Sequence, residues 1–103
     1  IDYRPAQPVD MVICCEVLEH CERWAQIVAV SSTWLKQNGR MVVTCANPLR
    51  APHSAIDGRH LREGEYYAGV TGAELAGEMQ KSGLLLDSIE TLGTDTRASG
   101  VRI

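Results

Sequence analysis

An unbroken apolar run followed by a change of hydrophobic period constrains the fold of this chain more than any other feature. Val9–Cys15 reads V-D-M-V-I-C-C without polar alternation, which is typical of a strand buried on both faces of a parallel sheet. From about Val17 to Lys36, apolar residues recur at steps of three and four, and polar residues such as Glu19 fall on the opposite side. This pattern predicts an amphipathic helix that ends at Asn38 and Gly39, because glycine favours a left-handed helix cap.

A second apolar run, rich in β-branched residues, completes a strand–helix–strand unit. Arg40–Ala46 reads R-M-V-V-T-C-A, which favours a strand. Two strands joined by a helical crossover form a βαβ unit, in which the strands are parallel and the crossover is right-handed. Residues 47–70 then form a long connection that contains Pro48, Pro52 and several glycines. A connection of this length within a compact domain is usually functional or disordered.

The last part of the chain predicts one more helix and a pair of strands. Thr71 and Glu74 form the sequence pattern of a capping box, which begins a short helix that ends at about Ser82. Leu84–Leu92 predicts a third strand and Ala98–Ile103 a fourth. The predicted order is β-α-β-loop-α-β-β, an α/β fold that forms part of a doubly wound sheet, with the last strand antiparallel. Its first strand is then an apolar edge without a partner.

Length and charge exclude several classes of protein. The 103 residues allow one domain at most, so residues 1–103 are treated as a single partial domain. Ten Lys and Arg residues against 13 Asp and Glu residues give a net charge of −3, which disfavours binding to a nucleic-acid backbone. No apolar run approaches the ~18 residues of a membrane span, and no signal-peptide pattern is present. We therefore expect a cytoplasmic protein that contacts no membrane.

The four cysteines favour neither a disulfide scaffold nor a metal site. Cys14 and Cys15 are adjacent, and Cys21 and Cys45 follow closely, which is not the spacing of a disulfide-rich secreted protein. We expect reduced, buried thiols. The set of Cys14, Cys15, His20 and Cys21 invites comparison with a zinc site, but adjacent strand residues point to opposite faces and no C-x-x-C pair is present. The sequence therefore predicts no metal site.

Three segments carry a resemblance to a known family. They are V-D-M-V-I-C-C-E-V-L-E-H at residues 9–20, W-L-K-Q-N-G-R-M-V-V-T at residues 34–44, and K-S-G-L-L-L at residues 81–86. In this order and spacing they resemble the class I S-adenosylmethionine-dependent methyltransferases of the type 11/12 kind. The first resembles the family's fourth strand and the Glu-His pair that follows it. The others resemble the fifth strand and the entry to the sixth. The resemblance implies methyl transfer from S-adenosylmethionine to an acceptor.

The family's main cofactor motif has no counterpart here. The family holds the methionine part of the cofactor with a glycine-rich turn after its first strand, and the sequence contains no E/D-x-G-x-G-x-G stretch. The first residue is Ile1 rather than Met. The resemblance therefore covers only the C-terminal half of such an enzyme, and we expect the chain, a natural or experimental truncation, to be inactive alone and to bind the cofactor weakly or not at all.

The resemblance also implies which residues would face the cofactor. Cys15 and Glu16 end the first predicted strand, and ligands of such sheets bind in the crevice at the carboxyl ends of the strands. Asp2 is a candidate for the acidic residue that, in the family, hydrogen-bonds the adenine amine. For Glu16 an alternative interpretation stays open, since an acid at the start of a helix also complements the helix dipole.

Candidate acceptor-side residues lie after the first strand and in the long connection. His20 follows the strand end and is a candidate base or orienting residue, because histidine titrates near neutral pH. His53 is a second candidate, and Tyr66 and Tyr67 are candidate substrate residues in a connection that often covers the acceptor in this family. Each has a structural alternative: His20 as a helix residue, His53 and His60 as ordinary loop residues, and the tyrosines as packing residues.

Three functions remain open at this point. The first is a fragment of a methyltransferase that acts on a small-molecule, protein or nucleic-acid acceptor, of which a small molecule fits the polar and aromatic connection. The second is a non-catalytic module that self-associates, in which two copies pair their exposed first strands into a homodimer. The third is one chain of an enzyme whose glycine-rich half is a separate chain.

Overall fold

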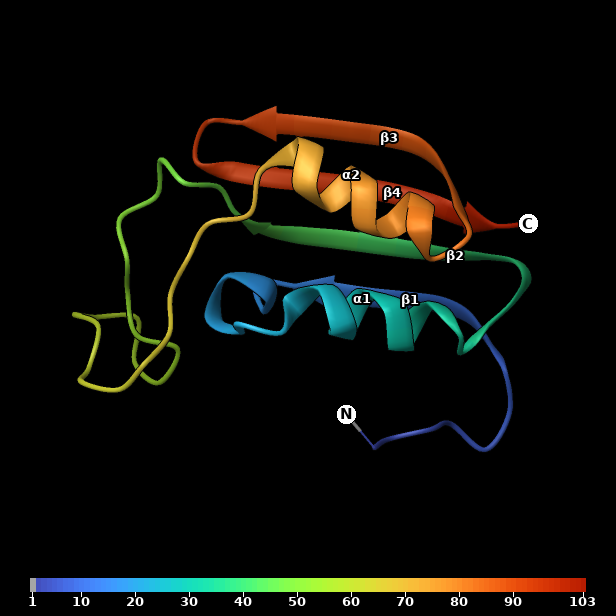
Figure 1. Ribbon diagram of the computed structural model, residues 1–103, viewed down its shortest axis with the longest axis horizontal. Coiled ribbons are helices and arrows are strands. Elements are labelled where there is room, and N and C mark those ends of the chain that lie inside the picture. Colours follow the sequence, from blue (N-terminus) through green and yellow to red (C-terminus); the bar gives the residue numbers. More distant parts are fainter. Residues whose placement is uncertain (1) are drawn as a thin grey trace.

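In the computed structural model, which describes residues 2–103, one mixed sheet carries two α-helices (Figure 1). The four strands lie in the order β1-β2-β4-β3. The sheet is built from β1 (Val9–Cys15), β2 (Leu35–Ala46), β3 (Leu84–Leu92) and β4 (Asp95–Arg102). The helices are the short 3-10 helix η1 (Leu18–His20) and the α-helices α1 (Trp24–Ser32) and α2 (Gly72–Lys81). This confirms the predicted order β-α-β-loop-α-β-β, with η1 as an added turn.

The directions of the strands place three carboxyl ends at one edge of the sheet. β1 pairs with β2 in parallel, with Ile13 opposite Val42 and Cys15 opposite Thr44. β4 is antiparallel to both β2 and β3, so β3 runs in the same direction as β1 and β2. The predicted antiparallel last strand is therefore confirmed. η1 and the long connection 47–70 both begin at this carboxyl edge, which is on the left in Figure 1.

Both α-helices cover the same face of the sheet (Figure 1). Alternate residues of β2 point to that face because successive strand side chains point to opposite sides. The core therefore lies between the helices and this face of the sheet, with Leu18 of η1 and Val28 of α1 among its buried side chains. Its most deeply buried apolar side chains include Met41, Val43, Cys45, Leu75 and Met79.

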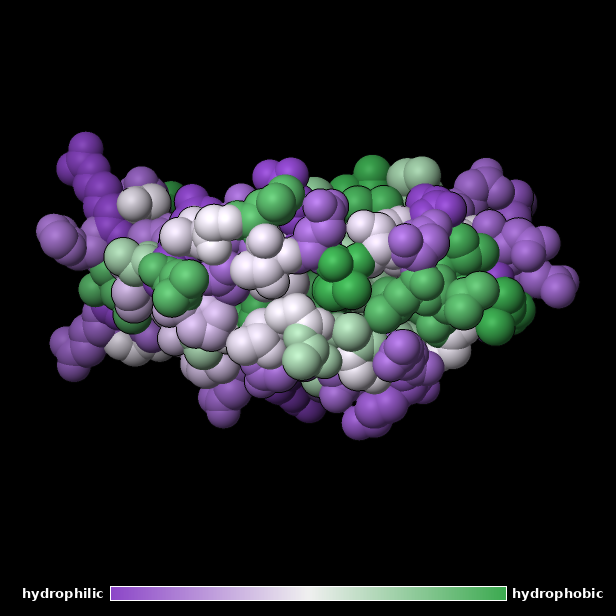
Figure 2. All heavy atoms as spheres, turned by 90° about the horizontal axis from the view of Figure 1, so that it is seen from above, coloured by the Kyte–Doolittle hydropathy of each residue, from purple (hydrophilic) through white to green (hydrophobic). Residues whose placement is uncertain are grey.

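The opposite face of the sheet exposes apolar side chains. On β1, Met11 is 49% exposed and Ile13 is 65% exposed, whereas Val12 between them is buried under the helices. The predicted burial of this strand on both faces is therefore wrong, because helices cover only one face of the sheet. β1 pairs with β2 alone among residues 2–103, which confirms that it is an edge strand. At the other edge, apolar side chains gather toward the right-hand end of the molecule, where β3 begins (Figure 2), and Leu85 there is 59% exposed.

The predicted helix over Val17–Lys36 is wrong in its bounds. The chain forms η1, then a break, and α1 ends at Ser32. Neither helix has a side-chain cap at its start. At the end of α1, Ser31, Ser32 and Thr33 donate their hydroxyl groups back to main-chain carbonyls three or four residues earlier. Such bonds compete with helix continuation, so the helix stops before the apolar pattern does.

The predicted helix end at Asn38 and Gly39 lies inside β2 instead. The amide of Val9 donates to the Trp34 carbonyl at 2.8 Å, so pairing with β1 draws this segment into the sheet. The register then shifts, because Val9 pairs with Leu35 while Met11 pairs with Arg40. The intervening residues form a bulge, in which Asn38 takes the left-handed conformation (φ 68°). The sequence pattern predicts this conformation for Gly39 instead.

The second half of the chain follows the prediction closely. The capping box is present: the Glu74 amide donates to Thr71 Oγ1 at 3.1 Å, and the Thr71 amide donates to Glu74 Oε1 at 3.0 Å. α2 ends at Lys81, and Gly83 has the positive φ of 86° that reverses the chain into β3. β4 begins at Asp95, earlier than the predicted Ala98, because a turn at Gly93 and Thr94 joins the two strands directly.

Candidate functional site

Three aromatic side chains meet at the carboxyl edge of the sheet. His20 ends η1, while His53 and Tyr67 lie in the connection 47–70. Their ring centroids are 5.0 Å (His20–His53), 5.3 Å (His20–Tyr67) and 5.1 Å (His53–Tyr67) apart, with steep angles between the planes. This edge-to-face packing is a favourable geometry for aromatic rings. The structure therefore brings both predicted histidines together with one of the two predicted tyrosines, and we call these three residues the ring cluster.

Main-chain hydrogen bonds hold Tyr67 against η1. The Ala68 amide donates to the Glu19 carbonyl at 2.9 Å, and the Val70 amide donates to the Ala46 carbonyl at 2.9 Å. The buried Thr96 hydroxyl of β4 donates to the Val70 carbonyl at 2.7 Å. Between them, Gly69 passes so close to Asn47 that a Cβ atom would lie 2.3 Å from its main-chain carbon. The returning connection is thus fixed at the sheet edge, and the ring cluster with it.

Glu19 is completely buried beside the ring cluster. Its side chain has no hydrogen-bond partner on either carboxylate oxygen within the described residues, and Oε2 lies 4.0 Å from His20 Nε2. His20 Nδ1 and the Tyr67 hydroxyl are also buried without a partner in this part of the structure. Buried polar groups are normally hydrogen-bonded, so four unpartnered atoms on three neighbouring residues are unusual. They mark a place that can bind a polar ligand.

The sequence pattern had placed Glu19 on the solvent side of a long helix, and this is wrong. Residues 17–23 form a 3-10 turn and a break instead of a continuous α-helix, so their side chains do not follow the helical period. The connection 47–70 then returns over the turn and buries Glu19. Glu19 and His20 form the Glu-His pair on which the family resemblance partly rests, and this pair was the sequence signal that could have identified Glu19 as a site residue.

Burial shifts the pKa values of several groups near the site. It raises the pKa of Tyr67, and the negative charge of Glu19 adds to the effect. Desolvation raises the pKa of Cys14 to about 11 and that of Cys45 to about 12. These two thiols are therefore protonated near neutral pH and are poor nucleophiles. All four cysteines are free, but of the four only Cys45 is buried; Cys15 is exposed, so the expected burial of the thiols is wrong for it.

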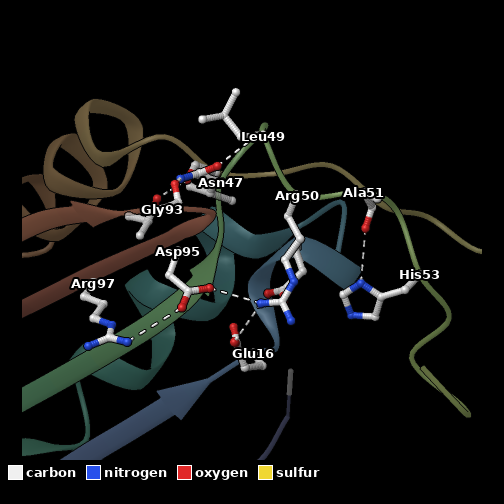
Figure 3. Close-up of polar contacts among 12 residues, drawn as sticks. Glu16, Asn47, Leu49, Arg50, Ala51, His53, Gly93, Asp95 and Arg97 are labelled. Carbon is white, nitrogen blue, oxygen red and sulfur yellow. Dashed lines mark hydrogen bonds and ion pairs between the residues drawn. The ribbon is translucent and has the colours of Figure 1, made fainter. Parts of the chain in front are cut away.

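Glu16 belongs to a charged group next to the ring cluster (Figure 3). Arg50 Nη1 lies 3.5 Å from Glu16 Oε1 and 3.0 Å from Asp95 Oδ1, so one guanidinium joins the ends of β1 and the beginning of β4. Burial raises the pKa of Glu16, as do the charges of Glu19 and Asp95, while Arg50 lowers it. The sequence pattern did not identify Arg50, although it lies only four residues after the end of the second strand.

The remaining predicted residues are placed differently. Cys15 is exposed at the carboxyl end of β1, next to Glu16. Asp2 is not brought to them: its neighbour Tyr3 packs against Trp34, with ring centroids 5.2 Å apart, at the amino end of β1. Tyr66 is 37% exposed and is not part of the ring cluster. His60 is likewise exposed, farther along the connection.

One set of side chains at this edge could hold a metal ion. Glu19, His20 and His53 each offer one ligand atom, and these atoms lie within 4.8 Å of one another. The expectation of no metal site was based on Cys14, Cys15, His20 and Cys21, and only His20 is common to both sets. The acid lies next to one histidine in sequence, but the second histidine lies more than thirty positions away, so no local spacing pattern reveals the set.

Comparison with known proteins identifies the fold. No family model and no curated protein matches the sequence. Among solved structures, an S-adenosylmethionine-dependent methyltransferase from Mesorhizobium loti superposes with a TM-score of 0.75 at 14% identity, over 98% of this chain and 66% of that one. A putative S-adenosylmethionine-dependent methyltransferase from Listeria monocytogenes gives 0.69 at 11% identity, over 94% and 62%. A DhpI–SAH complex gives 0.68 at 17% identity, over 96% and 50%.

These structures account for nearly all of this chain, while the chain spans no more than 66% of their length. Among residues 2–103, neither α-helix has the length and apolar sequence that a membrane crossing needs. The chain has the fold of the class I S-adenosylmethionine-dependent methyltransferases, over the part of that fold that its four strands and two α-helices represent.

Proposed function

We propose that this chain is the acceptor-side half of an S-adenosylmethionine-dependent methyltransferase, and that it binds the cofactor only together with a glycine-rich half. The observation that carries the proposal is the position of the ring cluster. His20, His53 and Tyr67 meet at the carboxyl edge of the parallel pair β1–β2. In open α/β sheets, ligands bind in the crevice outside this edge.

The cofactor would supply a methyl group on a positively charged sulfur, which is already activated for transfer. In such a transfer the bond between sulfur and methyl would break as the bond between methyl and the acceptor formed, and the acceptor would release a proton to a base. The protein therefore mainly aligns the acceptor with the methyl group and receives the proton. These are tasks for side chains on the acceptor side of the crevice.

The residues of this chain fit one wall of a cofactor crevice. Cys15 and Glu16 lie at the end of β1 and would line that wall. β1 and β2 are followed by Glu16 and Asn47 rather than by glycines, so the main chain here offers no glycine-rich turn for the methionine part of the cofactor. Asp2 lies near the amino end of the sheet with Tyr3, which gives no support to its predicted contact with the adenine.

The ring cluster suits a small-molecule acceptor that carries a hydroxyl or similar polar group. The unpartnered Tyr67 hydroxyl and His20 Nδ1 can each form a hydrogen bond with such a group. In the metal-free site, an imidazole of His20 or His53 can accept the proton that the acceptor releases. The edge-to-face packing of His53 against His20 and Tyr67 holds the side chains from the connection 47–70 in one arrangement.

Calorimetric titration with S-adenosylhomocysteine, the product of methyl transfer, tests the proposal. We expect no micromolar binding to the 103-residue chain, and micromolar binding to the longest polypeptide translated from its gene or to the chain with its glycine-rich partner. Micromolar binding to the 103-residue chain alone would show that its crevice is complete. An absence of binding in the folded longest polypeptide and in every complex purified with it would contradict the cofactor assignment.

A second function is favoured by the exposed edge of β1. We propose as an alternative that two copies pair their β1 strands around a twofold axis, which extends the sheet and partly covers the exposed apolar face. β1 is hydrogen-bonded to β2 alone among the described residues, and Met11 and Ile13 are exposed on it. A long apolar edge strand of this kind is prone to pair with another strand.

Light scattering coupled to size-exclusion chromatography tests the alternative. We expect a dimer for the unmodified chain and a monomer for Ile13→Lys, because a charge on the edge strand blocks pairing. Ile56→Lys is the matched control, since Ile56 is similarly exposed (69%, against 65% for Ile13) but lies in the connection. A monomeric unmodified chain at high concentration, or an Ile13→Lys variant that still dimerises, would contradict this function.

A further inference from the structure

We propose that Glu19, His20 and His53 bind one divalent transition-metal ion of the Zn²⁺ class at the carboxyl edge of the sheet. The proposal starts from geometry. The three residues come from η1 and from a connection that follows β2, and their ligand atoms all lie within 4.8 Å of one another. The fold therefore brings His53 to two ligands, Glu19 and His20, that are adjacent in the sequence.

The distances fit a site that closes around an ion. Zinc bonds to histidine nitrogen and carboxylate oxygen measure about 2.0–2.2 Å, so neighbouring ligand atoms of a tetrahedral site lie roughly 3.3 Å apart. Glu19 Oε2 and His20 Nε2 are separated by 4.0 Å. Closing the set requires displacements on the order of 1 Å, which side-chain rotation supplies without main-chain movement.

The burial of Glu19 is independent support for a cation at this place. The residue is fully buried, and neither carboxylate oxygen has a hydrogen-bond partner among residues 2–103. A buried carboxylate is normally paired with a cation, hydrogen-bonded or bound to a metal, because burial of an uncompensated charge is costly. A bound divalent ion would supply the partner that both oxygens lack.

His53 is held in an orientation that suits a ligand. Its Nδ1 lies 3.4 Å from the carbonyl oxygen of Ala51, as Figure 3 shows. Metal-binding histidines commonly donate one ring N–H to a main-chain carbonyl, which leaves the other ring nitrogen free for the ion. Here the contact with Ala51 would leave Nε2 of His53 for the metal.

The ligand types select the class of ion. Two imidazoles and one carboxylate suit zinc and neighbouring transition metals, whereas magnesium and calcium prefer all-oxygen sites. Three protein ligands also leave a fourth position for water or substrate, which is typical of catalytic zinc sites. A role for that position in holding the oxygen of a methyl acceptor rests on the proposed function; binding of the ion does not.

Titration of the metal-free chain with Zn²⁺ and with Co²⁺, a spectroscopic substitute, tests the proposal. Calorimetry should give one Zn²⁺ ion per chain. The Co²⁺ complex should show the weak visible absorption of nitrogen and oxygen ligands and no intense near-ultraviolet band from thiolate ligation. The spectrum thus distinguishes this site from binding by the four free cysteines.

Variants of two histidines in the same connection make the test specific. His53→Ala should weaken Zn²⁺ binding more than about 100-fold, since even loss of a supporting second-shell contact costs about 10–100-fold. His60→Ala is the matched control, because His60 is exposed and is not a member of the ligand set. His53→Gln, which keeps a polar side chain, repeats the test if the alanine variant loses its circular dichroism spectrum.

The outcomes separate this proposal from the proposed function. The site is supported if the unmodified chain and His60→Ala each bind one Zn²⁺ ion and the His53 variants lose this binding. An unmodified chain that binds no Zn²⁺, a thiolate band in the Co²⁺ spectrum, or equal affinity in the folded His53 variants overturns it. None of these results bears on binding of S-adenosylhomocysteine, which is measured separately on the longest polypeptide and its complexes.

Discussion

Replacement of Glu19 by Gln should stabilise the metal-free chain while abolishing its metal affinity. Glu19 is fully buried, and its carboxylate has no hydrogen-bond partner within residues 2–103. Its nearest cationic candidate, His20 Nε2, lies 4.0 Å away, beyond hydrogen-bond distance. Glu19→Gln keeps the size and shape of the side chain and removes the charge. The substitution therefore isolates the effect of the buried charge.

The expected magnitude is the difference between two burial penalties. An uncompensated buried charge costs several kcal/mol even after the surroundings relax. A buried neutral amide without partners costs about 1–3 kcal/mol. In the presence of a chelator, we therefore expect Glu19→Gln to raise the free energy of unfolding by about 1–3 kcal/mol, and to raise the urea midpoint by roughly 1 M. Removal of a buried acidic side chain rarely increases stability. Such an increase would indicate that the charge at this position serves ligand binding rather than folding.

Urea unfolding at pH 7, followed by circular dichroism, measures the effect. Added Zn²⁺ at about 100 times its dissociation constant should stabilise the unmodified chain by about 2.7 kcal/mol and leave Glu19→Gln unchanged, which would reverse or cancel their difference. Glu22→Gln is the matched control, since Glu22 is exposed three residues farther on and should respond to neither change. A Glu19→Gln variant that is less stable than the unmodified chain in chelator would refute the reasoning.

Three further results are expected. Thr96→Val should lower the free energy of unfolding by about 1–2 kcal/mol and speed hydrogen exchange at the Ala68 amide. The reason is that the Thr96 hydroxyl donates to the Val70 carbonyl and so fixes the returning connection. Unchanged exchange would show that this hydrogen bond does not fix the connection. Gly69→Ala should lower the free energy of unfolding by about 1–3 kcal/mol in thermal unfolding, since its Cβ would lie 2.3 Å from Asn47, and a neutral effect would contradict the close approach. The contribution of Cys14 to stability should be fully present below pH 9 and be lost as pH rises from 9 toward 11 in urea titrations, because burial raises the pKa of Cys14 from 9.0 to about 11, so the unfolded chain loses this proton first. Replacement of Cys14 by Ala should remove part of that fall.

The elements that form through local chemistry could be predicted from the sequence. The unalternating run Val9–Cys15 forms β1, and the capping-box pair Thr71 and Glu74 begins α2 where expected. Gly83 takes the left-handed conformation that separates α2 from β3. For α2 and for Gly83, the deciding interaction lies within a few residues, so the sequence pattern contains it. For β1 the apolar composition predicts the strand, although its pairing partner β2 lies about thirty positions later in the chain.

Elements decided by distant partners were predicted less well. The apolar stripe continues through Trp34 and Leu35, but the hydrogen bond between the Val9 amide and the Trp34 carbonyl draws that segment into β2. The left-handed residue is Asn38 and not Gly39, because the bulge between the two registers sets the conformation. A helical period cannot reveal a competing strand that lies earlier in the chain.

The candidate site divides in the same way. His20, His53 and Tyr67 were predicted individually from their residue types and from the family resemblance, and the structure brings them together. Burial of Glu19 depends on the return of the connection through the Ala68 amide, which no sequence period records. Arg50, which joins Glu16 and Asp95, depends equally on the pairing of β2 with β4.

Transfer of a labelled methyl group by the longest polypeptide of this gene, or by its complex with a glycine-rich partner, tests the central claim most directly. With radiolabelled S-adenosylmethionine and a panel of hydroxylated small molecules, we expect label to reach at least one acceptor. His53→Ala should lower kcat/KM by about 100-fold or more and leave the affinity for S-adenosylhomocysteine unchanged, and His60→Ala should change neither. Equal transfer by His53→Ala, or no transfer to any acceptor by a preparation that binds S-adenosylhomocysteine, would contradict an acceptor site at the ring cluster.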